Sequence, residues 1–144
     1  MAISKICKML CTFLMMSCFL TGCSSGKYAD IIYNNWGIML PNDWKEIYEY
    51  QSDSSSLGDG ERYHVFECDD FETVANDIDW EKSKNENVEN MILSTIEGFS
   101  IKSDYVINFQ SEYEYFYKQK NDNSKLLIVH ILESNLVYII ENFM

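Results

Sequence analysis

The chain has 144 residues, of which 47% are hydrophobic and 15% aromatic, with a single proline. This composition excludes an intrinsically disordered chain, which would be poor in apolar and aromatic residues. The 23 acidic residues outnumber the 11 lysine and arginine residues and give a formal net charge of −12. Because a negative surface repels phosphate groups, we expect no nucleic acid among the partners of this protein.

The first 22 residues have the pattern of an export signal. Lys5 and Lys8 form a positively charged start, and an apolar segment over residues 9–20 follows them. A membrane-spanning helix needs about 20 apolar residues, whereas the hydrophobic region of a secretory signal needs about 7–15. The apolar segment therefore predicts export, and it runs directly into the tetrapeptide LTGC at residues 20–23.

This tetrapeptide closely resembles the lipobox of bacterial lipoproteins. The resemblance implies that the peptide before Cys23 is removed and that the Cys23 thiol receives a diacylglycerol. Two acyl chains hold a protein stably on a membrane, whereas one chain attaches it only marginally. We therefore expect a lipid anchor at Cys23 on the extracytoplasmic face of the cell membrane. The alternative is an ordinary signal peptide whose mature chain begins near a cysteine.

The domain boundaries follow from the cut before Cys23. We expect a signal peptide over 1–22, a lipidated tether over 23–29 and a single domain over 30–144. Cleavage leaves 122 residues, a size typical of one domain, and removes two lysines but no acid, so the net charge becomes −14. Cys68 is the one cysteine after Cys23, so the domain depends on its core instead of on a disulfide, and Cys68 is expected to be a buried thiol.

The first part of the domain is predicted to be extended, because aromatic and β-branched residues gather in short runs between turn residues. These runs are Asp30–Tyr33, Trp36–Leu40, Trp44–Gln51 and Glu61–Cys68. A turn at Asn34-Asn35 separates the first two runs. The small and polar segment Ser52–Gly60 predicts a loop between the last two.

Between residues 71 and 99 the spacing of apolar residues becomes helical. The first predicted helix carries Phe71, Val74, Ala75 and Ile78 on one face. The second carries Val88, Met91, Ile92, Ile96 and Phe99, and it is expected to end near Gly98.

The last part of the chain returns to strands separated by turns. The predicted strands are Tyr105–Phe109, Glu112–Lys120, Lys125–Leu132 and Leu136–Asn142, with turns at 121–124 and 134–135. Residues 126–132 are apolar on both faces, which indicates a central strand covered on both sides.

The resulting order, β-β-β-α-α-β-β-β, predicts an α+β fold in which an antiparallel sheet has its helices packed on one face. Residues 37–44, with the sequence GIMLPNDW, resemble the opening of the PsbP-like fold, which several exported bacterial lipoproteins share. This resemblance implies an architecture and no function.

No catalytic or ligand motif follows Cys23. His64 and Cys68 lie on one predicted strand about 13 Å apart, too far to bind one zinc ion or to act as nucleophile and base. His130 is expected to be a hydrogen-bonded core residue. The acids at 77–81 lack the glycine and the glutamate of a calcium loop. We therefore expect no metal, no cofactor and no enzymatic activity.

One aromatic pattern suggests a binding role. Tyr113, Tyr115 and Tyr117 alternate along one predicted strand, so they share a face and form a candidate interaction surface. Packing of these side chains under a helix or against neighbouring strands is the favoured alternative. The function expected from the sequence is a membrane-anchored lipoprotein that acts as a small protein-binding module. The alternatives are an immunity or inhibitor lipoprotein against a basic toxin, and an envelope enzyme built on a pocket that joins His64, His130 and Cys68.

Overall fold

Five antiparallel strands form one open sheet with the spatial order β1-β2-β5-β4-β3. The structure is a computed structural model that describes residues 25–52, 60–68 and 78–144. The strands are β1 (Lys45–Gln51), β2 (Gly60–Glu67), β3 (Tyr113–Gln119), β4 (Lys125–Ile131) and β5 (Leu136–Phe143). The helices are α2 (Ser25–Trp36) and α3 (Glu86–Ile96), with a 3-10 turn, η2, at Ser103–Tyr105. The predicted α+β class and antiparallel sheet are confirmed.

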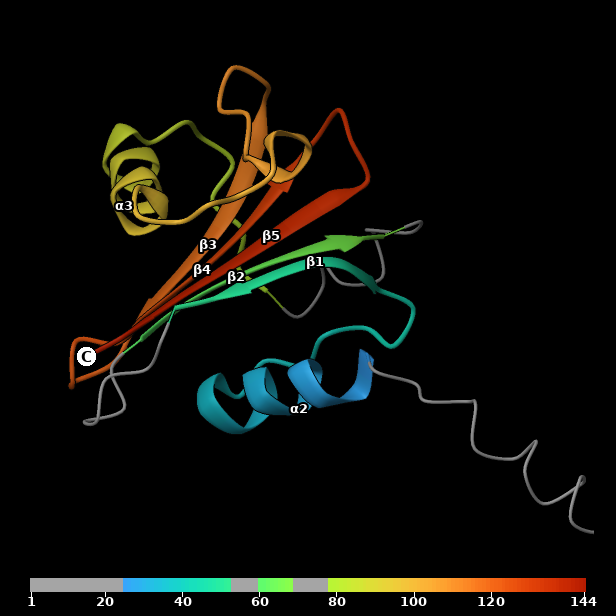
Figure 1. Ribbon diagram of the computed structural model, residues 1–144, viewed down its shortest axis with the longest axis vertical. Coiled ribbons are helices and arrows are strands. Elements are labelled where there is room, and N and C mark those ends of the chain that lie inside the picture. Colours follow the sequence, from blue (N-terminus) through green and yellow to red (C-terminus); the bar gives the residue numbers. More distant parts are fainter. Residues whose placement is uncertain (1–24, 53–59, 69–77) are drawn as a thin grey trace, which may run out of the picture.

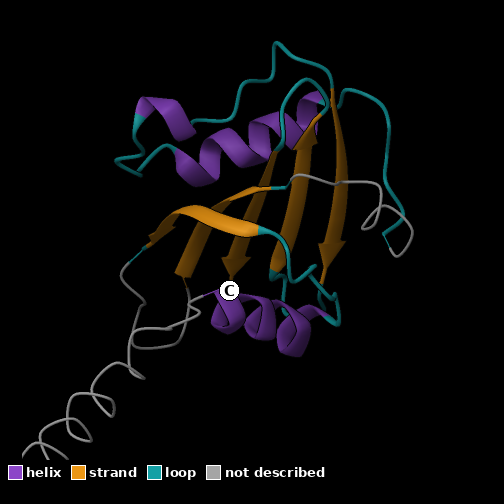
Figure 2. Cartoon of the chain, turned by 90° about the vertical axis from the view of Figure 1, so that its right-hand side faces the viewer, coloured by secondary structure: helices purple, strands orange, loops and turns teal. Residues whose placement is uncertain are grey.

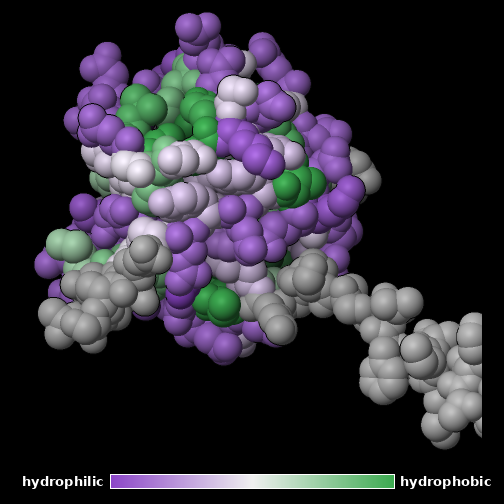
Figure 3. All heavy atoms as spheres, viewed as in Figure 1, coloured by the Kyte–Doolittle hydropathy of each residue, from purple (hydrophilic) through white to green (hydrophobic). Residues whose placement is uncertain are grey.

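The two helices lie on opposite faces of the sheet. Figure 1 shows α3 on one side of the strands and α2 on the other, and Figure 2 shows the same three layers from a perpendicular direction. The expectation that the helices pack on one face is wrong. The inner strands β4 and β5 are buried on both faces, so each face needs its own cover. On the outside, Figure 3 shows a largely hydrophilic surface with hydrophobic residues in separate patches.

Helix α2 replaces the extended chain that was predicted for Asp30–Tyr33 and Trp36–Leu40. Tyr28, Ile32 and Trp36 lie four residues apart and are all buried against the sheet. Gly37 ends the helix with φ of 71°, a conformation that glycine adopts without steric cost. Because the helix begins at Ser25 and Tyr28 is buried, the folded part starts before the expected boundary at Asp30.

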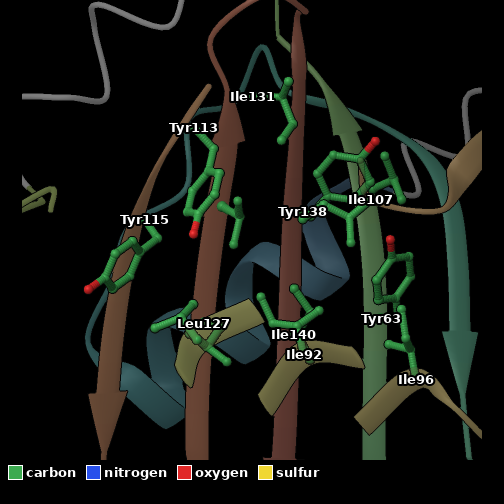
Figure 4. Close-up of a cluster of buried hydrophobic side chains, with 13 residues drawn as sticks. Tyr63, Ile92, Ile96, Ile107, Tyr113, Tyr115, Leu127, Ile131, Tyr138 and Ile140 are labelled. Carbon is green, nitrogen blue, oxygen red and sulfur yellow. The ribbon is translucent and has the colours of Figure 1, made fainter. Parts of the chain in front are cut away.

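Helix α3 covers the second face. Asn85 caps its N-terminus by accepting hydrogen bonds from the backbone amides of Asn87 and Val88, as short polar side chains do at this position. Figure 4 shows that Ile92 and Ile96 of the helix pack over Tyr63, Leu127 and Ile140 of the sheet. The helix predicted around 88–99 is thus confirmed, although it ends at Ile96.

The remaining strand predictions agree with the structure to within one or two residues, with one exception. Residues 105–109 were predicted to form a strand, but Tyr105 ends the 3-10 turn η2 and irregular chain follows. Tyr105 and Ile107 pack into the α3-side core, which is the hydrophobic cluster between α3 and the sheet. The residues of this segment are apolar because they are buried there, although the segment does not pair with a strand. The loop predicted at 52–60 and the helix predicted from Phe71 lie largely outside the described residues. None of the described helices is long and apolar enough to cross a membrane.

Candidate ligand-binding cleft

A cleft of about 480 Å³ opens between the N-terminal half of α2 and the edge of the sheet formed by β1 and β2. Helix α2 contributes Tyr28 and Ile31 to its lining. The sheet contributes residues 46–49 and Gln51 from β1, and Arg62 and His64 from β2. The cleft is therefore built on two paired strands and a helix that packs against them.

A β-bulge in β1 determines which side chains reach the cleft. Glu46 pairs with Phe66 and Glu49 pairs with His64, while the register shifts between Glu46 and Tyr48. Ile47 is the extra residue that this shift inserts. Residues that pair directly in an antiparallel sheet share a face. The bulge therefore places Glu46 and Glu49 on the α2 face, where strict alternation would put them on opposite faces.

His64 is a nearly buried imidazole in the wall of the cleft. Its ring stacks on Tyr28, with ring centroids 3.5 Å apart and an interplanar angle of 16°. Its Nδ1 contacts a carboxylate oxygen of Glu46. Its Nε2 has no hydrogen-bond partner among the described residues. The position of the ring is thus set by one carboxylate and by stacking on α2.

A second carboxylate, Glu141 of β5, attaches α2 to the sheet. It is fully buried and accepts hydrogen bonds from the Tyr28 hydroxyl at 2.8 Å and from the Trp36 indole N–H at 2.6 Å. The Arg62 guanidinium lies 3.5 Å from the same carboxylate. Burial raises the pKa of Tyr28 well above its usual value, and the adjacent Glu141 raises it further. This network fixes the helix that forms one wall of the cleft.

The other histidine lies in a separate polar contact. His130 Nδ1 is 3.1 Å from Glu114, which also lies 4.0 Å from Lys82. His64 pairs with Ile139 and His130 pairs with Val137, on opposite sides of β5. Two strand spacings separate the two histidines, a lateral distance of about 10 Å. The structure therefore does not join them in one site, and Cys68 is buried.

The three candidate tyrosines are not equivalent in the structure. Tyr113 and Tyr115 are buried in the α3-side core, and only Tyr117, at 37%, is appreciably exposed. The Tyr113 hydroxyl donates to Glu89 of α3 and accepts from the Asn85 backbone N–H, both at 2.8 Å. Burial raises the pKa of Tyr113 to about 12. Tyr113 and Tyr115 thus pack under α3, in agreement with the alternative that was favoured over an exposed interaction surface.

Sequence reasoning considered His64 but missed α2, which forms one wall of the cleft, and Glu141, which attaches α2 to the sheet. Tyr28, Ile32 and Trp36 followed by Gly37 form a helical repeat with a stop signal, which was available in the sequence. Glu141 stands two residues after Ile139 in an apolar strand, a spacing that places it on a buried face. Cys23, the expected lipidation site, lies outside the described residues.

No protein family model, curated protein or solved structure matches the chain. The chemistry of the cleft must therefore be read from its own side chains. Glu46 and Glu49 make its β1 side negative, and Arg62 is engaged by Glu141. Such an arrangement favours a cation or a cationic group of a larger ligand.

Proposed function

We propose that the protein is a lipid-anchored binding protein on the extracytoplasmic face of a membrane and that it holds its ligand in the cleft between α2 and β1. The observation that carries the proposal is the cleft itself. Its volume of about 480 Å³ falls in the range of about 300–1,000 Å³ that is typical of small-molecule sites. Its acidic side chains come from strands, which hold them more firmly than a loop does.

In this proposal the anchor and the cleft are close to one another. Helix α2 begins two residues after Cys23, so an extended connection between them reaches about 7 Å. Tyr28 and Ile31, in the first two turns of that helix, line the cleft. The ligand would therefore be bound close to the membrane surface, nearer than a seven-residue tether would place it.

The anchor is tested by growing a bacterium that expresses the full chain with labelled palmitate. We expect the wild type to take up label and to sediment with membranes. The Cys23→Ser variant is expected to lose the label, whereas Cys68→Ser, which alters a buried thiol, is expected to keep it. A wild type without label, or a Cys23→Ser variant that is labelled to the same extent, would contradict the lipid anchor.

A second candidate function, inhibition of a basic toxin, is favoured by the net charge of −14 that is expected after cleavage and by the acidic side of the cleft. Charge pairing of this kind weakens as salt screens it. For a basic toxin encoded beside this chain, we expect affinity to fall steeply with ionic strength and to fall again in Glu49→Gln. Affinity that is independent of salt would exclude this mode of binding.

A further inference from the structure

Three side chains of metal-ligand type meet in the cleft. Glu46, Glu49 and His64 each bring one ligand atom, and these atoms all lie within 4.8 Å of one another. The two acids come from β1 and the histidine from β2, and the bulge at Ile47 is what brings both acids to the face of the histidine. The cluster therefore depends on a specific irregularity of the sheet.

The charges of the cluster are not balanced by the protein around it. Two carboxylates close together repel each other. Arg62, the one cationic side chain among the residues that line the cleft, lies beside Glu141. No described residue forms an ion pair with Glu49. A bound cation would offset this repulsion.

His64 supplies the nitrogen ligand of the cluster. Its side chain is 6% exposed, and its Nε2 has no hydrogen-bond partner in the described part of the chain. Buried polar atoms in folded proteins nearly always have partners. Nε2 is itself buried, so the nitrogen that an ion in the cleft can reach is Nδ1, which contacts the Glu46 carboxylate.

We propose that the cleft binds a divalent transition-metal ion, with Zn²⁺ as the best match, through Glu46, Glu49 and an imidazole nitrogen of His64. This inference rests on the proposed binding function and names the ligand of the cleft. An imidazole with two carboxylates suits zinc and its neighbours, whereas Ca²⁺ and Mg²⁺ favour shells made of oxygen alone. Three protein ligands leave a fourth tetrahedral position for water or for a donor atom of a larger ligand.

Binding of the ion requires adjustment of the two glutamate side chains. Two bonds of about 2.1 Å at a tetrahedral angle place their ligand atoms about 3.4 Å apart, closer than the present limit of 4.8 Å. Glu49 is exposed, so its side chain has room to rotate toward the ion. His64 Nδ1 and the Glu46 carboxylate oxygen contact each other directly, so the Glu46 side chain must rotate away from the imidazole to admit the ion between them.

The test is a calorimetric titration of the full chain with Zn²⁺ in detergent, after its accessible thiols have been alkylated so that cysteines do not take up the metal. We expect one bound ion per chain, and much weaker binding of Mg²⁺. Glu49→Gln changes an exposed side chain and leaves the core intact. Removing a residue that only hydrogen-bonds a metal ligand lowers metal affinity by up to about 100-fold. Because Glu49 is itself a ligand, its loss should lower the affinity at least about 100-fold. Glu46→Gln should do the same.

Glu67→Gln is the matched control, because Glu67 is an exposed acid of β2 outside the cleft, 3.9 Å from Lys45. Its affinity for Zn²⁺ should equal that of the wild type, and circular dichroism should show that all variants are folded. The inference is overturned if the wild type binds no zinc, if Glu49→Gln binds it as tightly as the wild type, or if Mg²⁺ binds equally well. Palmitate labelling tests the anchor separately, so failure of one proposal is distinguishable from failure of the other.

Discussion

Glu141 is the residue on which the position of α2 most depends. It is fully buried and contacts Tyr28, Trp36 and Arg62. Removing one partner of a buried charge pair leaves the other unpaired and costs about 3–5 kcal/mol. We therefore expect Glu141→Ala to lower the free energy of unfolding by that amount in urea titrations followed by tryptophan fluorescence.

Glu67→Gln provides the comparison for this substitution. The ion pair of Glu67 with Lys45 is exposed on both sides, and such pairs contribute at most about 1 kcal/mol. Equal losses in the two variants would show that Glu141 does not hold the helix in the way that its contacts indicate.

Buried tyrosines make the stability depend on alkaline pH. Burial raises the pKa of Tyr28 and of Tyr63 above the usual value of about 10. Above that pH the unfolded chain releases these protons while the folded chain retains them, so stability falls as pH rises. Each such tyrosine contributes a slope of about 1.4 kcal/mol per pH unit. Urea titrations between pH 9 and pH 11 should show the decline, and Tyr63→Phe should make it shallower; an unchanged slope would contradict the assignment.

The alternation of residues was enough to predict the faces of β2 but not those of β1. Alternation along β2 places Tyr63 and Val65 on one face and His64 and Phe66 on the other, and the two core clusters agree for Tyr63, Val65 and Phe66. In β1 the same rule fails at Ile47, because the bulge shifts the register by one residue. The bulge depends on pairing with β2, which no local pattern of residues reveals. The cluster of Glu46, Glu49 and His64 was therefore missed.

At the scale of elements, α2 shows how packing overrides local preference. Residues 30–36 are rich in β-branched, aromatic and asparagine residues, which favour strands and turns over helix. The amphipathic repeat of Tyr28, Ile32 and Trp36 decides the outcome, because as a helix all three reach the core. Strands such as β4 and β5 were predicted closely, because there the pattern of apolar residues and the strand propensity of those residues agree.

The packing of α2 is tested by two neighbouring isoleucines. Ile32 is fully buried, whereas Ile31 is 37% exposed at the rim of the cleft. Ile32→Ala is expected to cost about 2–5 kcal/mol of unfolding free energy, as is typical of buried isoleucine, and Ile31→Ala clearly less. If both substitutions had the same effect in urea titrations, the orientation of the helix would be wrong.

Helix α3 is stabilised at its start by Asn85. The side chain of Asn85 caps two backbone amides and its Nδ2 donates to the Tyr115 hydroxyl at 2.9 Å. Asn85→Ala should therefore cost about 1 kcal/mol or slightly more. The control is Asn87→Ala, at an exposed position in the first turn, which should change the thermal midpoint little. A midpoint for Asn85→Ala equal to that of the wild type would contradict the cap.

At the scale of the whole molecule, the sheet is covered by a helix on each face. This arrangement explains how a chain without a disulfide in its described part is stabilised as one domain. Each face of the inner strands is buried under one helix, and the two cores are separated by the sheet. The α+β class was predictable because the period of apolar residues changes along the chain. The layering was not, because it required recognising α2. In the proposed anchored state, α2 is also the first folded element after the lipid.

Docking of α2 on the sheet is thus the central structural claim, since this helix forms a wall of the cleft and stacks on His64. The most direct measurement is hydrogen exchange of the backbone amides of residues 30–36, compared with those of β5. We expect slow exchange in both segments of the wild type, and selectively faster exchange of residues 30–36 in Glu141→Gln. Exchange of residues 30–36 at the rate of a free peptide, while β5 stays protected, would contradict the claim.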